Sequence, residues 1–257
     1  MSLKAKLLYL LSAIVLFMSP FLGEITLSFK DIFNSSSMSH TIFWDLRIPR
    51  VILAFFVGGI LALGGLIFQI VFKNQLITPY TLGIASGTTL FTAIAIVFLP
   101  FLNISISAIF GSILTIMILY FISKKMNNGS IAVSTNSILL TGIALSYFYA
   151  SALMLVFYMS NLQENYSIVR FTLGSLDTVG YMNSAIIVGV SIIFYLIVSY
   201  YKKDIKLLLI SNDTAFLKGL NVNKLNIILL VTISLCVGIS ISFVGPIGFI
   251  GLVIPHI

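Results

Sequence analysis

The residues that could carry acid–base, metal or ion chemistry lie between the apolar segments of this sequence and not within them. All seven acidic residues are placed in this way: Glu24, Asp31, Asp45, Glu164, Asp177, Asp204 and Asp213. No Lys, Arg or His falls in mid-segment either, apart from His256 near the end of the chain. Carriers coupled to protons or sodium usually keep ionisable groups inside the membrane. This distribution argues against ion-coupled transport, although unwound backbone can also coordinate sodium.

The sequence also lacks the motifs of several functional classes. It has no HExxH motif or other cluster of metal ligands, which argues against a metalloprotease, and no mid-helix lysine that could bind retinal. A glycine-rich phosphate loop is missing, so the chain is not expected to hydrolyse ATP or to be an enzyme. We expect it to bind no metal or cofactor, and any energy from ATP must come through a partner.

Two arginines, Arg47 and Arg50, stand three residues apart in the sequence LRIPR, directly before an apolar segment. With the N-terminus in the cytoplasm, both are expected on the outer face, against the tendency of basic residues to stay in the cytoplasm. One explanation is that they anchor the helix end by reaching the lipid headgroups. The amphipathic Trp44 and the helix-starting Pro49 fit that explanation.

Small residues recur at four-residue spacing in the helix that follows. In lipid, helix backbones approach closely where such residues face one another. A second GxxxG pair belongs to a helix expected to start at Thr78-Pro79-Tyr80. We therefore predict that five residues form helix-packing faces: Ala54, Gly58, Ala62, Gly83 and Gly87. The triplet of Ser234, Gly238 and Ser242 is interpreted in the same way.

The largest loop expected in the cytoplasm covers residues 202–226. Asn212 or Asp213 can cap a short helix, with 214–218 as its body. Gly219 can supply the left-handed residue that ends it. On spacing alone, an ordinary basic loop that sets topology is the favoured interpretation.

Composition identifies the class of protein. Hydrophobic residues make up 59% of the 257 residues and charged residues only 8%, whereas soluble domains carry about a quarter charged residues. A membrane-spanning helix needs about 20 mostly apolar residues. We predict an all-α polytopic membrane protein, a single domain over 1–257, with seven spans at 7–23, 51–72, 80–99, 104–122, 138–159, 183–201 and 225–244.

The basic loops indicate the orientation. With the N-terminus inside, cytoplasmic loops hold ten of the fourteen Lys and Arg residues, as the positive-inside rule requires. The first apolar segment has no small-residue cleavage site after it, so we interpret it as an uncleaved helix. The net charge of +7 then reflects topology and not nucleic-acid binding.

The last residues predict only the start of an eighth helix. Pro246 to Ile257 would span about 18 Å as a helix, against a hydrocarbon core of about 30 Å. A chain ending there would leave unpaired carbonyls near the membrane, so we expect a shortened chain, a frameshifted gene or an incomplete sequence. Gly/Pro-interrupted segments around Pro79 and after Gly245 suggest an inverted repeat with the transport path at its interface.

Three motifs resemble one family. LRIPR, the Gly/Ala-rich helix ending in Gln69, and GPIGFIGLVIPH at 245–256 resemble the FecCD permeases, the membrane subunits of ABC importers for iron–siderophore, haem and cobalamin. The resemblance covers the whole chain, and because the family fold has ten helices, it implies that the family's last quarter or so is missing here. The segment SNDTAFLKGLNVN is similar to the family's coupling loop, although Asn212 and Asp213 match its first positions poorly.

The resemblance implies roles for particular residues. It assigns Arg47 and Arg50 to docking of a substrate-binding protein through its glutamates, where charge pairs mainly steer and align. Residues of the coupling loop are expected to contact the ATPase: Asn212, Asp213, Thr214, Ala215, Lys218 and Gly219. Weakly polar residues are expected to line the translocation path: Gln69, Asn74, Ser86 and Thr88. The alternative for the hydroxyls is a bond to a carbonyl of their own helix.

The sequence therefore predicts the permease subunit of a binding-protein-dependent ABC importer in the inner membrane, for a ferric siderophore or similar iron chelate, haem or cobalamin. Its expected partners are two cytoplasmic ATP-binding subunits, which use the ATP, an extracytoplasmic substrate-binding protein and a second permease copy, identical or not. The alternatives are a non-transporting remnant and, less favoured, an ion-coupled carrier, with a seven-helix receptor more distant. The residues do not identify the cargo.

Overall fold

The computed structural model describes residues 3–126 and 135–256, and these residues form helices without any strand. The helices of the N-terminal part are α1 (Leu3–Met18), η1 (Ser19–Phe21), α2 (Phe29–Ile32), α3 (Met38–Thr41), the π-helical η2 (Ile42–Arg47) and α4 (Ile48–Phe72). The middle of the chain forms α5 (Ile84–Phe98), α6 (Ile104–Met126), α7 (Thr135–Met159) and α8 (Leu162–Leu173). The rest comprises α9 (Met182–Tyr200), α10 (Lys202–Ile210), α11 (Asn212–Leu217), α12 (Val222–Val244), α13 (Ile250–Val253) and η3 (Ile254–His256).

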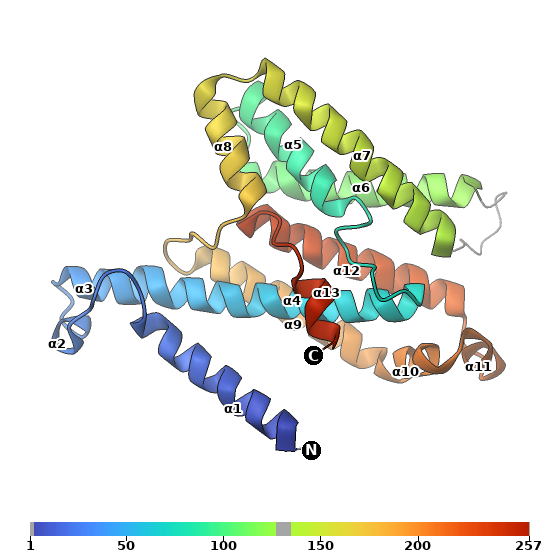
Figure 1. Cartoon of the computed structure of the whole chain (residues 1–257), viewed down its shortest axis with the longest axis horizontal. Coiled ribbons are helices and arrows are strands. Elements are labelled where there is room, and N and C mark those ends of the chain that lie inside the picture. Colours follow the sequence, from blue (N-terminus) through green and yellow to red (C-terminus); the bar gives the residue numbers. More distant parts are fainter. Residues whose placement is uncertain (1–2, 127–134, 257) are drawn as a thin grey trace. The chain divides into compact units, whose positions relative to one another are not determined.

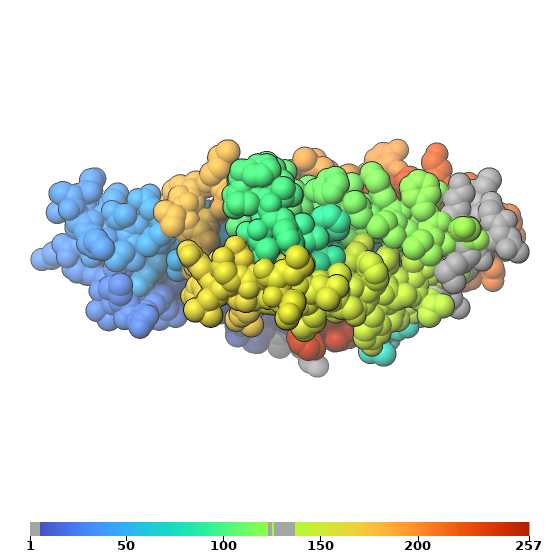
Figure 2. Space-filling view, turned by 90° about the horizontal axis from the view of Figure 1, so that it is seen from above, coloured from blue at the N-terminus to red at the C-terminus, as the bar shows by residue number. Residues whose placement is uncertain are grey.

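Two compact units are distinguished in the described chain. The first runs to Val57 and includes Leu176–Gly189, and the second holds Gly58–Ser175 and the residues from Val190 onward. In the second unit, α5 packs against α6, α7, α8 and α12, and α6 also packs against α12 (Figure 1). Figure 2 shows α8, in yellow, beside α5, in green, on one face of this unit.

The all-α membrane architecture predicted from composition is confirmed. Within residues 3–126 and 135–256, five helical stretches are long and apolar enough to cross a membrane: Met38–Phe72, Ile104–Ile122, Ser137–Met159, Met182–Tyr200 and Val222–Val244. Two shorter apolar helices, Lys6–Phe21 and Ile84–Phe98, coincide with the remaining predicted spans. Ile257 lies outside the described residues, as do the residues between α6 and α7.

Two predicted boundaries were wrong. The helix expected from Thr78-Pro79-Tyr80 begins only at Ile84, because Gly83 has a φ of 79° and so interrupts the helical path just before it. Residues 78–81 form a turn instead, in which the Thr81 hydroxyl donates to the Thr78 carbonyl. Residues 202–226 are not mainly loop, since α10 and α11 fill most of them.

The triplet on α12 is a packing face, as predicted. Ser234 and Ser242 are buried. A Cβ added at Gly238 would lie 2.4 Å from the Cβ of Ser112 on α6. The helices can approach this closely only because the residue is glycine.

Candidate docking and translocation sites

Arg47 is tied to the backbone of the segment that follows α1. Its guanidinium donates to the carbonyls of Pro20 at 3.1 Å and Phe21 at 3.3 Å, and also to that of Ile25. A Cβ at Gly23 would lie 2.6 Å from the guanidinium, so the segment wraps closely around it. Carbonyls at the end of a helix have no helical partner, and Arg47 satisfies those of η1. The side chain is therefore a structural tie within its unit.

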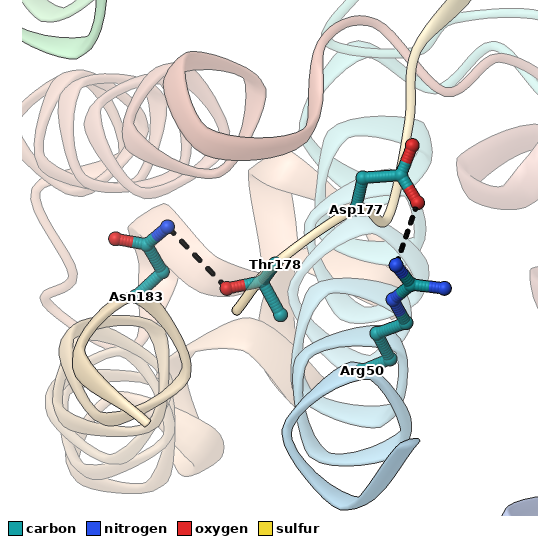
Figure 3. Close-up of polar contacts among 4 residues, drawn as sticks. All are labelled: Arg50, Asp177, Thr178 and Asn183. Carbon is teal, nitrogen blue, oxygen red and sulfur yellow. Dashed lines mark hydrogen bonds and ion pairs between the residues drawn. The ribbon is translucent and has the colours of Figure 1, made fainter. Parts of the chain in front are cut away.

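Arg50, one turn further along, faces a carboxylate. Its Nη2 lies 3.1 Å from Oδ1 of Asp177, and the two side chains are 43% and 52% exposed. Figure 3 shows the guanidinium directed at Asp177, with Thr178 and Asn183 forming a separate contact at 3.4 Å. The two predicted docking arginines thus have different surroundings in the same unit.

The segment 177–184 is held against the start of α4 by further bonds. The Gly180 amide donates to the Asp45 carbonyl, the Tyr181 hydroxyl to the Trp44 carbonyl and the Ser184 hydroxyl to the Pro49 carbonyl, each at 2.8 Å. Burial, and secondarily the nearby Asp45 carboxylate, raises the pKa of Tyr181, so its phenol stays a donor. Sequence reasoning missed Asp177, Tyr181 and Ser184, because they lie more than a hundred residues from their partners.

The closest helix contacts involve glycines other than those predicted first. A Cβ at Gly58 would meet no atom within 4 Å, and Ala54 and Ala62 are half-buried. By contrast, a Cβ at Gly65 would lie 2.0 Å from the Gly251 carbonyl oxygen. The role of Ala54, Gly58 and Ala62 in packing stays a prediction.

The second predicted glycine pair is surrounded by its own unit. A Cβ at Gly83 would lie 3.1 Å from the Gly142 carbonyl oxygen on α7, and one at Gly87 would lie 2.0 Å from the Thr115 hydroxyl on α6. Gly83 contacts α7 from its position as the N-cap and not from within α5.

The two interrupted segments contact each other within the second unit. The Gln69 side-chain amide lies 3.5 Å from the Leu252 carbonyl oxygen, and the Tyr80 hydroxyl accepts the Ile247 amide at 2.9 Å. Together with the contact of Gly65 and Gly251, these bonds pack α13 against α4 and the turn before α5. The sequence indicated that these segments correspond, but nothing in it pointed to Tyr80 as their link.

The four candidate path residues have different surroundings. Gln69 and Asn74 both line a cavity of about 430 Å³ that Lys73 and His256 also border. Thr88 is fully buried and its hydroxyl donates to the Ile84 carbonyl at 2.7 Å, the own-helix bond that the sequence left as the alternative. Ser86 is half-buried.

The coupling-loop candidates form α11. The predicted cap was wrong: Ser211, not Asn212 or Asp213, caps the helix by accepting the Asp213 amide. Gly219 ends it with a φ of 80°, as predicted, and the Leu220 amide bonds back to the Ala215 carbonyl at 3.1 Å. This pattern is a Schellman motif.

The surface of α11 is unexpectedly apolar. Phe216 is 73% and Leu217 84% exposed, while Ala215 is fully buried and so anchors the helix from inside. Exposed residues beside them are Asn212, Asp213, Lys218 and Gly219, and Thr214 is half-buried. Sequence reasoning passed over Phe216 and Leu217, although two large apolar residues in a basic loop were a usable signal.

The chain is similar in sequence to known proteins. The sequence profile of the FecCD transport family matches residues 10–257. The chain belongs to the FecCD transport family. This FecCD chain is 34% identical over 239 residues to the probable iron chelatin transport system permease protein of Helicobacter pylori, covering 91% of the chain and 71% of the relative. It is 32% identical over 250 residues to the hemin transport system permease protein HmuU of Yersinia pestis, covering 92% and 72%.

A solved structure agrees with the sequence comparisons. The FecCD chain matches a metal-chelate type ABC transporter in an inward-facing conformation with a TM-score of 0.84 and 25% identity, covering 97% of the chain and 78% of that structure. The vitamin B12 import system permease protein BtuC of Vibrio cholerae is 28% identical, with 86% of the chain and 66% of the relative covered. The FecCD chain is thus a multi-pass membrane protein of a transport family and not of an enzyme family.

Proposed function

We propose that this chain is the membrane permease subunit of a binding-protein-dependent ABC importer for an iron chelate, haem or cobalamin, with a ferric siderophore as the first substrate to test. The observation that carries the proposal is the family match over residues 10–257. The names of the relatives support this range of substrates, since they include iron chelatin, hemin and vitamin B12 systems. The chain itself binds no cofactor in this proposal, and ATP is used by its partner subunits.

The energy of ATP enters through α11. Two ATP-binding subunits dock on the cytoplasmic side of a permease dimer, one on each copy of this helix. The exposed Phe216 and Leu217 supply an apolar contact, of the kind that marks protein interfaces. The buried Ala215 anchors α11, and the left-handed Gly219 ends it shortly before α12, so that movement of the ATPase is passed to the transmembrane helices.

The substrate arrives from a binding protein on the outer face of the inner membrane, with the permease N-terminus in the cytoplasm. Arg50 supports docking because its charge is half exposed. Arg47 acts mainly by shaping the 20–25 segment, since backbone carbonyls surround its guanidinium. Gln69 and Asn74 border the path, and Ser86 and Thr88 stand near it.

Uptake in a strain lacking its own permease tests the function. The strain carries the full gene with its ATPase and binding protein, and is given radiolabelled ferric siderophore, haem or cobalamin in parallel. We expect one cargo to accumulate at least tenfold over a strain without the gene, and accumulation to stop when the phosphate-loop lysine of the ATPase is replaced. Accumulation abolished by a proton-gradient uncoupler at normal ATP levels would support an ion-coupled carrier instead.

A further inference from the structure

Asp177 already pairs with the Arg50 guanidinium, the same group that an acidic docking partner would need to contact. The two groups are 3.1 Å apart, and both remain about half exposed to solvent. Among the described residues, Arg50 has no other carboxylate partner, whereas Arg47 is engaged by backbone carbonyls. Arg50 is therefore the arginine of the LRIPR motif whose charge can be exchanged between carboxylates.

The loop that carries Asp177 does not depend on this pair to stay in place. The Gly180 amide, the Tyr181 hydroxyl and the Ser184 hydroxyl hold it to the start of α4 through three bonds of 2.8 Å. An ion pair with this exposure contributes little to stability, because water and salt screen it. The pair can therefore open without releasing the loop.

We propose that Asp177 is an internal competitor for docking: it pairs with Arg50 in the undocked permease and is displaced by an acidic side chain of the substrate-binding protein. This inference rests on the proposed function. Docking then exchanges one carboxylate for another, so the net gain in affinity is small, while the position of Arg50 still fixes the register. Asp177 keeps the complex weak enough for the emptied binding protein to leave.

The experiment measures binding of the purified substrate-binding protein of the same transport system to the full transporter in lipid nanodiscs. We expect Asp177→Asn to lower the Kd about two- to fivefold, the range that corresponds to loss of an exposed competing pair. The matched control is Asp45→Asn, since Asp45 is exposed on the same unit and forms no ion pair among the described residues. The control removes the same charge without freeing Arg50.

Two further measurements separate the ways in which the proposal can fail. If Arg50→Gln leaves the Kd unchanged when it is made in the Asp177→Asn background, where no internal carboxylate competes, Arg50 does not dock the binding protein and that part of the proposed function is wrong. If Arg50→Gln weakens binding but Asp177→Asn binds no more tightly than Asp45→Asn, only the exchange is overturned. Hydrogen exchange at the Gly180 amide should be the same in wild type and Asp177→Asn. Faster exchange would show that Asp177 holds the loop, which also overturns the proposal.

Discussion

At the scale of single residues, two arginines with the same sequence signal have different tasks. Both precede α4, but Arg47 donates to three backbone carbonyls while Arg50 faces Asp177. Guanidinium can serve several acceptors at once because its donors are arranged as a planar fork, which a lysine ammonium on a flexible stem does not match. The chemistry of the side chain, beyond its charge, decides what Arg47 does.

Replacing Arg47 by lysine keeps the positive charge but removes the planar arrangement of hydrogen-bond donors. We expect Arg47→Lys to lower the free energy of unfolding by about 1–3 kcal/mol, because carbonyls of the 20–25 segment lose a charged donor. Thermal unfolding of the purified permease complex in detergent measures this loss. The matched variant Arg50→Lys keeps its charge beside Asp177 and should change stability by less than about 1 kcal/mol. Equal stability of the two variants would contradict a structural role for Arg47.

At the scale of elements, the spacing of small residues predicted close packing but not its location. Gly58 and Gly59 have open space where a Cβ would stand, while Gly65 on the same helix touches the backbone of Gly251. All three belong to one glycine-rich run, so periodicity could not rank them. Which of these glycines makes the close contact depends on the position of α13. That position is set by contacts between residues distant in sequence, such as the bond from the Ile247 amide to the Tyr80 hydroxyl.

Alanine substitutions at two glycines of α4 test this difference. A Cβ at Gly65 would lie 2.0 Å from a backbone oxygen that cannot move alone. We expect Gly65→Ala to destabilise the protein by about 1–3 kcal/mol or more, since overpacking forces backbone shifts. Gly59→Ala meets no atom and should be neutral or gain up to about 1 kcal/mol from helix propensity. Unfolding midpoints in the same detergent compare the two, and a Gly65→Ala protein as stable as wild type would disprove the packing.

At the scale of the whole molecule, the sequence predicted the class, the membrane segments and the family. The length of an apolar segment and the positions of Gly and Pro are local properties, so the helices could be predicted directly from the sequence. The partners of Arg47 and Arg50 could not, because they are brought together by folding. The N-cap of α11 was predicted one or two positions too late, because three neighbouring residues, Ser211, Asn212 and Asp213, are all good caps. Only the backbone conformation of Ser211 shows that the helix begins after it.

The apolar surface of α11 supports the last prediction. We expect Phe216→Ser combined with Leu217→Ser to reduce substrate uptake about tenfold or more, because a few buried aromatic and apolar anchors carry most of the energy of an interface. Co-purification of the ATPase should fall in parallel, while the amount of permease in the membrane stays the same. Both residues are exposed in the single chain, so their loss should not unfold it.

Two controls assign this effect to α11. Phe216→Leu keeps an apolar group at the contact and should retain most of the uptake. Leu209→Ser removes an exposed apolar side chain from neighbouring α10, and it should leave ATPase co-purification unchanged. If Leu209→Ser releases the ATPase and the α11 double variant does not, the docking surface lies on α10. The energy of ATP would then reach the membrane helices through residues 202–210, and the role of the Ser211 cap and of Gly219 would be to hold the turn behind that surface.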